Sequence, residues 1–325
     1  MKRKCSCLVV AMLALGVGLR GQAPDVGKIL GAARAALGGE KKLSSLKTLA
    51  ATGQSVRVTA DGSSAPTDFE MAFELPDKFM KKDVMAMMGN VAITRTSGFN
   101  GDAVINVIDQ PPAMPGMIRI VRGGPGGDPN APQTPEQQAE NRKNMLIAAK
   151  QDFSRLLLGF IVSSFITYPL EFSYGGQAES PDGRADIIDV KGEGGFAARL
   201  FIDQKTHLPL MLSWMAREPL VIQRAFTGAK PGAAPPAGGG ISHAQAATSD
   251  ERDKMMKQAQ EDARQAEAKL RVVEYRLYYG DYRDVDGVKV PFQLQRSIDG
   301  KPSEEVTLEK VKINGKIDPN KFQTR

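Results

Sequence analysis

Side chains that commonly carry catalysis or bind metals are few in this sequence, and they do not follow known catalytic spacings. The two histidines, His207 and His243, are far apart, and neither has a neighbour at a metal-ligand spacing. There is no Gly-x-Ser-x-Gly elbow, no His-Glu-x-x-His segment and no phosphate-binding glycine loop. Carboxylates alone can hydrolyse glycosides, but no pair here points to that chemistry. We therefore predict a protein that is not an enzyme and uses no cofactor or metal.

The residues most typical of a binding site are apolar. Seven methionines gather between positions 71 and 117, and thioether side chains line sites that accept varied apolar partners, although they also fill gaps in ordinary cores. Phenylalanines alternate along one predicted strand, and others recur at helical spacing. We predict that these two sets meet around an apolar, ligand-binding cavity; the alternative is that they form a filled core. The predicted cavity residues are Phe69, Met71, Phe73, Met85, Met87, Phe153, Leu157 and Phe160.

Hydrophobic periodicity predicts the elements that would position these residues. Apolar residues recur at intervals of three and four in 25–37 and 136–164, which indicates two helices. Asn100-Gly101, Asp286-Gly287 and Asp299-Gly300 are hairpin turn signals. Alternation typical of half-buried strands occupies 52–58, 67–75, 84–96, 103–108, 170–174, 185–190, 196–202, 209–215, 270–279, 288–297 and 304–313. We predict an α+β fold: a curled antiparallel sheet, an unclosed β-barrel of about eleven strands, with helices covering its concave face.

Two segments interrupt this pattern. Residues at about 110–135 are rich in Pro, Gly and Met, and those at about 227–269 combine a Pro/Ala/Gly stretch with a charged stretch that lacks an apolar stripe. Such compositions bury little apolar surface. We interpret residues 24–325 as one domain that carries these two segments as flexible insertions.

The N-terminus has the pattern of a secretory signal peptide in residues 1–23: basic residues, a short apolar run from Leu8 to Leu19, then small residues. The run is too short to span a bilayer, and no later stretch is apolar enough for a transmembrane helix. Cleavage would remove both cysteines and four cations without any acid, which lowers the net charge from +6 to +2. We predict a periplasmic or secreted protein, and the remaining charge gives no reason to expect nucleic acid as a partner.

Several local motifs, taken in their order along the chain, resemble the periplasmic outer-membrane lipoprotein-carrier superfamily, LolA/LolB-like in the broad sense. Each motif alone is strand and turn chemistry; their order is the specific part. The motifs are Ala36-Leu37-Gly38-Gly39, Pro76-Asp77-Lys78-Phe79, Gly98-Phe99-Asn100-Gly101, Thr206-His207-Leu208-Pro209-Leu210, Asp286-Gly287-Val288-Lys289-Val290-Pro291 and Asp318-Pro319-Asn320-Lys321-Phe322.

The resemblance implies an unclosed β-barrel whose helices cover an apolar cavity for acyl chains. It therefore implies a non-catalytic periplasmic binding or carrier protein, with a lipid or the acyl chain of a lipoprotein as its partner. The alternative is an envelope sensor, regulator or interaction module on the same fold that binds a protein partner.

Overall fold

The computed structural model describes residues 24–59, 62–88, 91–109, 134–181, 183–218 and 270–323, with the side chains of 59, 85–88 and 91–92 left out. The chain divides into two compact units: residues 1–115, 139–215 and 274–325 form the first, and residues 116–138 and 216–273 the second. Apart from the ends of three elements, the described helices and strands belong to the first unit. The interpretation as one domain with two insertions stays a prediction, because 110–133 and 219–269 lie outside the described residues.

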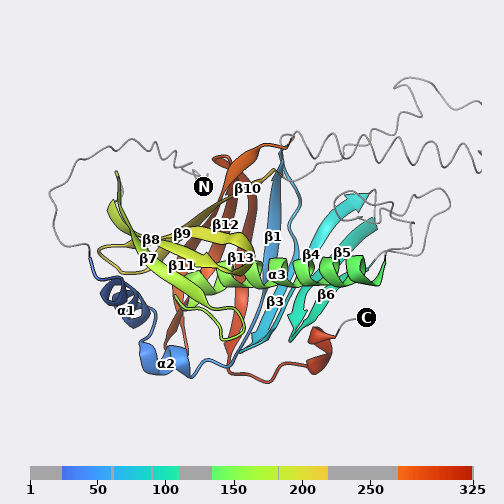
Figure 1. The fold of residues 1–325 in the computed structure, drawn as a ribbon, viewed down its shortest axis with the longest axis horizontal. Helices are drawn as coiled ribbons and strands as arrows, with labels where there is room; N and C mark the ends of the chain where they lie inside the picture. Colours follow the sequence, from blue (N-terminus) through green and yellow to red (C-terminus); the bar gives the residue numbers. More distant parts are fainter. Residues whose placement is uncertain are drawn as a thin grey trace, which may run out of the picture. The chain divides into compact units, whose positions relative to one another are not determined.

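A single antiparallel sheet forms the framework (Figure 1). Its strands run in the order β6-β5-β4-β3-β1-β13-β12-β11-β10-β9-β8-β7, and the short β2 pairs with β1. Since β6 and β7 are not paired with each other, the curled sheet is not closed, which confirms the predicted fold class. The strands are β1 (Thr48–Thr59), β2 (Gly62–Ser63), β3 (Thr67–Glu74), β4 (Lys78–Met88), β5 (Val91–Asn100), β6 (Ala103–Asp109), β7 (Leu170–Ser180), β8 (Gly183–Gly192), β9 (Phe196–Asp203), β10 (Pro209–Arg217), β11 (Val272–Val285), β12 (Val288–Ile298) and β13 (Lys301–Ile313).

The hairpins follow the turn signals at the C-terminal end of the chain. Asp286 and Gly287 have φ angles of 53° and 78°, and Asp299 and Gly300 have 51° and 75°. Positive φ at both central residues is the type I′ geometry that these sequences favour. One strand prediction is wrong: 84–96 is the end of β4 and the start of β5, with Met88 opposite Val91. The sequence between them is Gly89-Asn90, a hairpin signal that the continuous strand-like composition obscures.

Three α-helices accompany the sheet: α1 (Val26–Ala36), α2 (Glu40–Ser44) and α3 (Pro135–Phe160). The Asp25 side chain accepts a hydrogen bond from the Gly27 amide at 2.8 Å and caps α1, as N-terminal aspartates do. The predicted second helix ends four residues too late. Val162 takes a positive φ of 49°, which closes the helix as an αL residue does, and the serines at 163 and 164 favour non-helical conformations.

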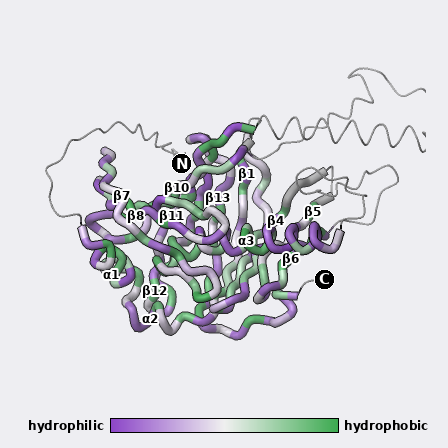
Figure 2. The backbone as a smooth tube through the Cα atoms, in the orientation of Figure 1, coloured by the Kyte–Doolittle hydropathy of each residue, from purple (hydrophilic) through white to green (hydrophobic). Residues whose placement is uncertain are grey.

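Helix α3 packs against one face of the sheet, which we call the helix face (Figure 1). Its Phe153 ring contacts Phe73 of β3 at a centroid distance of 5.4 Å and stacks on Phe79 of β4 at 4.7 Å. The first turns of the helix are hydrophilic, purple in Figure 2, and the buried residues of α3 all fall between 153 and 160. The C-terminal half of α3 therefore supplies most of the packing.

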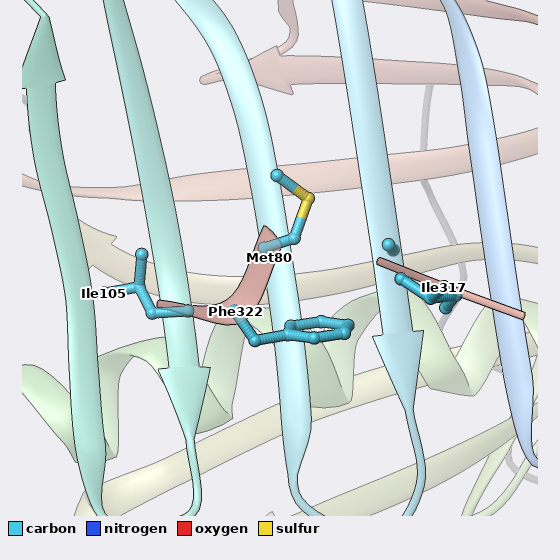
Figure 3. Close-up of a cluster of buried hydrophobic side chains, with 5 residues drawn as sticks. Met80, Ile105, Ile317 and Phe322 are labelled. Carbon is cyan, nitrogen blue, oxygen red and sulfur yellow. The ribbon is translucent and has the colours of Figure 1, made fainter. Parts of the chain in front are cut away.

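The opposite face of the sheet is covered over strands β3, β4 and β6 by the C-terminal segment (Figure 3). Its short 3-10 helix η2 (Pro319–Phe322) places Phe322 in a buried cluster. The Asn100 amide donates to the Phe322 carbonyl at 3.2 Å, and Lys321 pairs with Glu70. The buried cluster comprises Ala72, Met80, Ile105, Ile317 and Phe322.

Candidate functional site

Five of the eight predicted cavity residues line one small space between the sheet and α3, and a sixth, Phe69, is buried on the same face of β3. Antiparallel pairing keeps Phe69, Met71 and Phe73 on one face of β3, because successive side chains alternate. Spacings of four and three residues bring Phe153, Leu157 and Phe160 to one face of α3. All six are buried, each no more than 3% exposed. Met85 and Met87 belong to β4, but their side chains lie outside the described residues.

The space beside these residues is very small. A pocket of about 10 Å³ lies among them, lined by Met71, Phe73, Phe79, Phe153, Leu156, Leu157 and Phe160. A single water needs roughly 10–15 Å³ of such volume. The side chains therefore fill the interface in this structure, and a ligand-lining role for them stays a prediction.

The aromatic cluster extends beyond the predicted residues. Phe99 and Phe165 contact Phe153 at centroid distances of 5.7 and 5.0 Å, and Tyr168 continues the contact from Phe165 to Phe196. Such rings come from β5, β9 and the segment after α3, and no short sequence pattern links them. Phe99 alone could be placed from the sequence, because it directly precedes the hairpin signal Asn100-Gly101.

Hydrogen bonds and close packing fix α3 against the sheet. The Tyr279 hydroxyl donates to the Arg155 carbonyl at 2.5 Å, and the Tyr282 hydroxyl lies 3.0 Å from the Gly159 carbonyl. Gly159 lets the helix approach this closely, since a Cβ there would lie 2.1 Å from the Tyr279 ring. Burial raises the pKa of both tyrosines, so both stay neutral donors at ordinary pH.

A larger pocket lies on the opposite face of the sheet, over strands β7 to β12. Tyr279 contacts α3, so its neighbour Tyr278 points to the other face. Met211 pairs with Phe201 on that face. The pocket volume is about 370 Å³, within the range of small-molecule sites. Its lining is Ala178, Glu179, Ser180, Gly183, Arg184, Ala185, Phe201, Asp203, Leu210, Met211, Tyr278, Tyr279, Gly280, Gln293 and Gln295. We call it the β7–β12 pocket.

The floor of the β7–β12 pocket is apolar. Ala185, Phe201 and Met211 form a buried cluster, against which Ala178 and Tyr278 pack. Sequence reasoning missed this site because its residues come from six strands and include small and amide side chains that carry no binding signal of their own. The one sequence signal that could have indicated this site is the run of consecutive apolar residues in β8 and β9. Ile187-Ile188 and Leu200-Phe201-Ile202 point to both faces of the sheet, so apolar residues are expected on the face away from the helix as well.

Charged groups at the rim of the pocket are already paired. Arg184 contacts Glu179 at 3.1 Å across the β7–β8 hairpin. The Asp203 carboxylate accepts hydrogen bonds from Lys205 and Thr206. Burial raises the pKa of Asp203, but these hydrogen bonds and the Lys205 charge outweigh it and leave the pKa below its usual value. Asp203 is thus an ionised part of its own turn.

The described residues hold no cluster of three His, Cys, Asp or Glu side chains that could bind a metal ion. His207 is an exposed turn residue with a φ of 58°, and His243 lies outside the described residues. None of the described helices is long and apolar enough to cross a bilayer.

Comparison with known proteins gives similarity at the level of the fold. No protein-family model and no curated protein matches the sequence. A crystal structure of a putative outer membrane lipoprotein-sorting protein domain from Vibrio parahaemolyticus is similar, with 10% identity, coverage of 92% of this chain and 97% of the other, and a TM-score of 0.41. A LolA superfamily protein from Nitrosomonas europaea has 9% identity, coverage of 93% and 99%, and a TM-score of 0.44. A DUF1329 family protein from Desulfovibrio piger has 9% identity, coverage of 92% and 97%, and a TM-score of 0.44. The Nitrosomonas europaea protein bears the name of the superfamily that the sequence motifs resemble.

Proposed function

We propose that this protein is a non-catalytic binding or carrier protein for lipids or acyl chains. The observation that supports this most is the β7–β12 pocket, about 370 Å³ in volume with a floor of alanine, phenylalanine and methionine side chains. Apolar lining with a few polar groups is typical of sites that bind small apolar ligands. Hydrophobic transfer into such a pocket supplies the binding free energy without any reacting group.

We place this activity in the periplasm because of the N-terminal signature. That proposal rests on the sequence of residues 1–23. Protein purified from a native envelope should begin between Gln22 and Asp25 when its N-terminus is sequenced. An intact Met1 on most molecules would contradict the proposed location.

The binding test uses Nile red, an uncharged probe whose emission rises in apolar surroundings. The wild-type protein should bind the probe, and a bacterial envelope lipid extract should displace it. Ala178→Phe places a ring over the pocket floor and should weaken binding at least about tenfold, since the side chain would occupy the ligand's volume. Phenylalanine suits a strand, so this variant should still fold.

The matched control is Gln177→Phe, one residue earlier in β7, where the side chain is exposed and points to the other face. It should leave Nile red binding unchanged. Equal losses in both variants, or no binding of Nile red by the wild type, would contradict a ligand site in the β7–β12 pocket.

A further inference from the structure

We propose that the β7–β12 pocket takes a hydrocarbon chain whose polar head carries no net charge, such as a glycerol ester or a primary alcohol. The inference rests on the proposed function and specifies its ligand class. It follows from the volume of the pocket, from the pairing of its charges and from a side-chain amide at the rim that has no partner among the described residues.

The volume admits a hydrocarbon chain. A single water needs roughly 10–15 Å³ of such volume. At about 370 Å³, the pocket exceeds this minimum more than about twentyfold, so it has room for a medium-length hydrocarbon chain.

The charges argue against an ionised head. Arg184 is the only cation among the lining residues, and it is engaged by Glu179, which lies opposite it in the β7–β8 pairing. Alternation along the strands turns both side chains away from Ala178 and Ala185 on the pocket floor. Next to Tyr278, Arg276 is paired with Glu274 at 2.6 Å, and the Asp203 carboxylate is held by its own turn at distances of 2.5 to 3.0 Å. An anionic head would therefore meet carboxylates and an already paired cation, whereas a cationic head would have to compete with Arg276 and the Asp203 turn. A charge that enters an apolar pocket without a partner loses its hydration and gains no compensating contact.

The free hydrogen-bonding groups fit a neutral head. Gln295 is half-buried at the rim, and its side-chain amide makes no hydrogen bond to the described residues. Next to it across the strand pair, the Tyr278 hydroxyl lies 3.4 Å from a nitrogen of Arg276 and can donate its own hydrogen. An amide and a phenol together offer donors and an acceptor without charge, which is what a hydroxyl or ester group requires.

Gln293 provides an internal contrast. It lines the same pocket from the same face of β12, but its amide already donates to Glu305 at 2.7 Å. Two glutamines of one strand thus differ in whether their amide is available, and only Gln295 can offer its amide to a ligand without giving up a protein contact.

The experiment measures displacement of Nile red from the wild-type protein by three amphiphiles with a twelve-carbon chain, each below its micelle concentration. The amphiphiles are 1-dodecanoylglycerol, sodium dodecanoate and dodecyltrimethylammonium. We expect the uncharged glycerol ester to bind at least about tenfold more tightly than either ion, because one unpaired charge costs at least 1.4 kcal/mol here. Gln295→Leu should weaken the ester about three- to tenfold, while Gln177→Leu, on the other face of β7 and outside the lining, should change it less than twofold.

The outcomes separate the two proposals. If Nile red binds but dodecanoate displaces it as well as the ester does, the uncharged-head inference fails and the binding function stands. If Gln295→Leu weakens the ester no more than Gln177→Leu does, the assignment of the head to Gln295 fails. If the wild type binds neither Nile red nor any of the three amphiphiles, the proposed function itself fails.

Discussion

Replacing Leu157 by alanine distinguishes a filled core from a ligand cavity between α3 and the sheet. Leu157 is 1% exposed, and the free space beside it is about 10 Å³. Truncation of a buried leucine costs about 2–5 kcal/mol, and more when the neighbours cannot move into the space. The neighbours here are rings of Phe73, Phe79 and Phe153 that already contact one another at 4.7 to 5.4 Å. We therefore expect a loss of about 3–5 kcal/mol.

The measurement is urea unfolding followed by far-ultraviolet circular dichroism. Met145→Ala on the same helix is the matched control, because Met145 is 41% exposed and its truncation should cost less than about 1 kcal/mol. Met71→Ala on the sheet side should resemble Leu157→Ala, since Met71 is 2% exposed. If both buried variants lose no more stability than Met145→Ala, these side chains make few packing contacts. That result would favour the predicted acyl cavity between α3 and the sheet over a filled core.

Three further predictions follow from single contacts. Gly159→Ala should lower the melting temperature although alanine is the better helix former, because its Cβ would overlap the Tyr279 ring. As a control, Gly31→Ala in α1 should raise the free energy of unfolding by up to about 1 kcal/mol, since no atom lies within 4 Å of the new Cβ. The opposite order in thermal unfolding would refute the packing of Gly159 on Tyr279. Stability should fall above about pH 10 by up to about 1.4 kcal/mol per pH unit for each of Tyr279 and Tyr282, because burial raises their folded-state pKa above the unfolded one. Absorbance at 295 nm should show at least two of the six tyrosines ionising only on unfolding, since burial also raises the pKa of Tyr168; titration of all six in the folded protein would contradict this. Arg34→Met should cost about 1 kcal/mol in urea unfolding, since the guanidinium donates to the Ile161 carbonyl at 2.7 Å and also pairs with the exposed Glu40. An unchanged midpoint would mean that neither contact contributes.

Local sequence patterns predicted the elements better than the site. Asp25, the two Asp-Gly turns and the helical spacing of Phe153 and Leu157 each act within a few residues, so their structural consequence is visible in the sequence. The fold class followed from the number of alternating segments. The missed break between β4 and β5 also had a local sequence signal, Gly89-Asn90, but the strand-like residues on both sides obscured it.

The β7–β12 pocket could not be predicted in this way because it depends on register between strands far apart in the chain. Ala178 faces Ala185 within one hairpin, but Tyr278 and Gln295 reach the same surface only because β11 and β12 follow β10 in the sheet. A shift of one residue in any of these pairings would turn the lining to the helix face. The availability of the Gln295 amide is likewise a property of its neighbours and not of its residue type.

The two faces of the sheet therefore differ in the space that they leave for a ligand. On the helix face, aromatic rings from β3, β4, β5 and α3 fill the volume, and ligand entry there would require the helix to separate from Tyr279 and Tyr282. On the opposite face, the C-terminal segment seals the surface over β3, β4 and β6, and the pocket lies over β7 to β12. A ligand can enter the β7–β12 pocket without breaking any hydrogen bond that holds α3. For that reason we expect substitutions in the pocket to change binding with little effect on stability, and substitutions under α3 to change stability first.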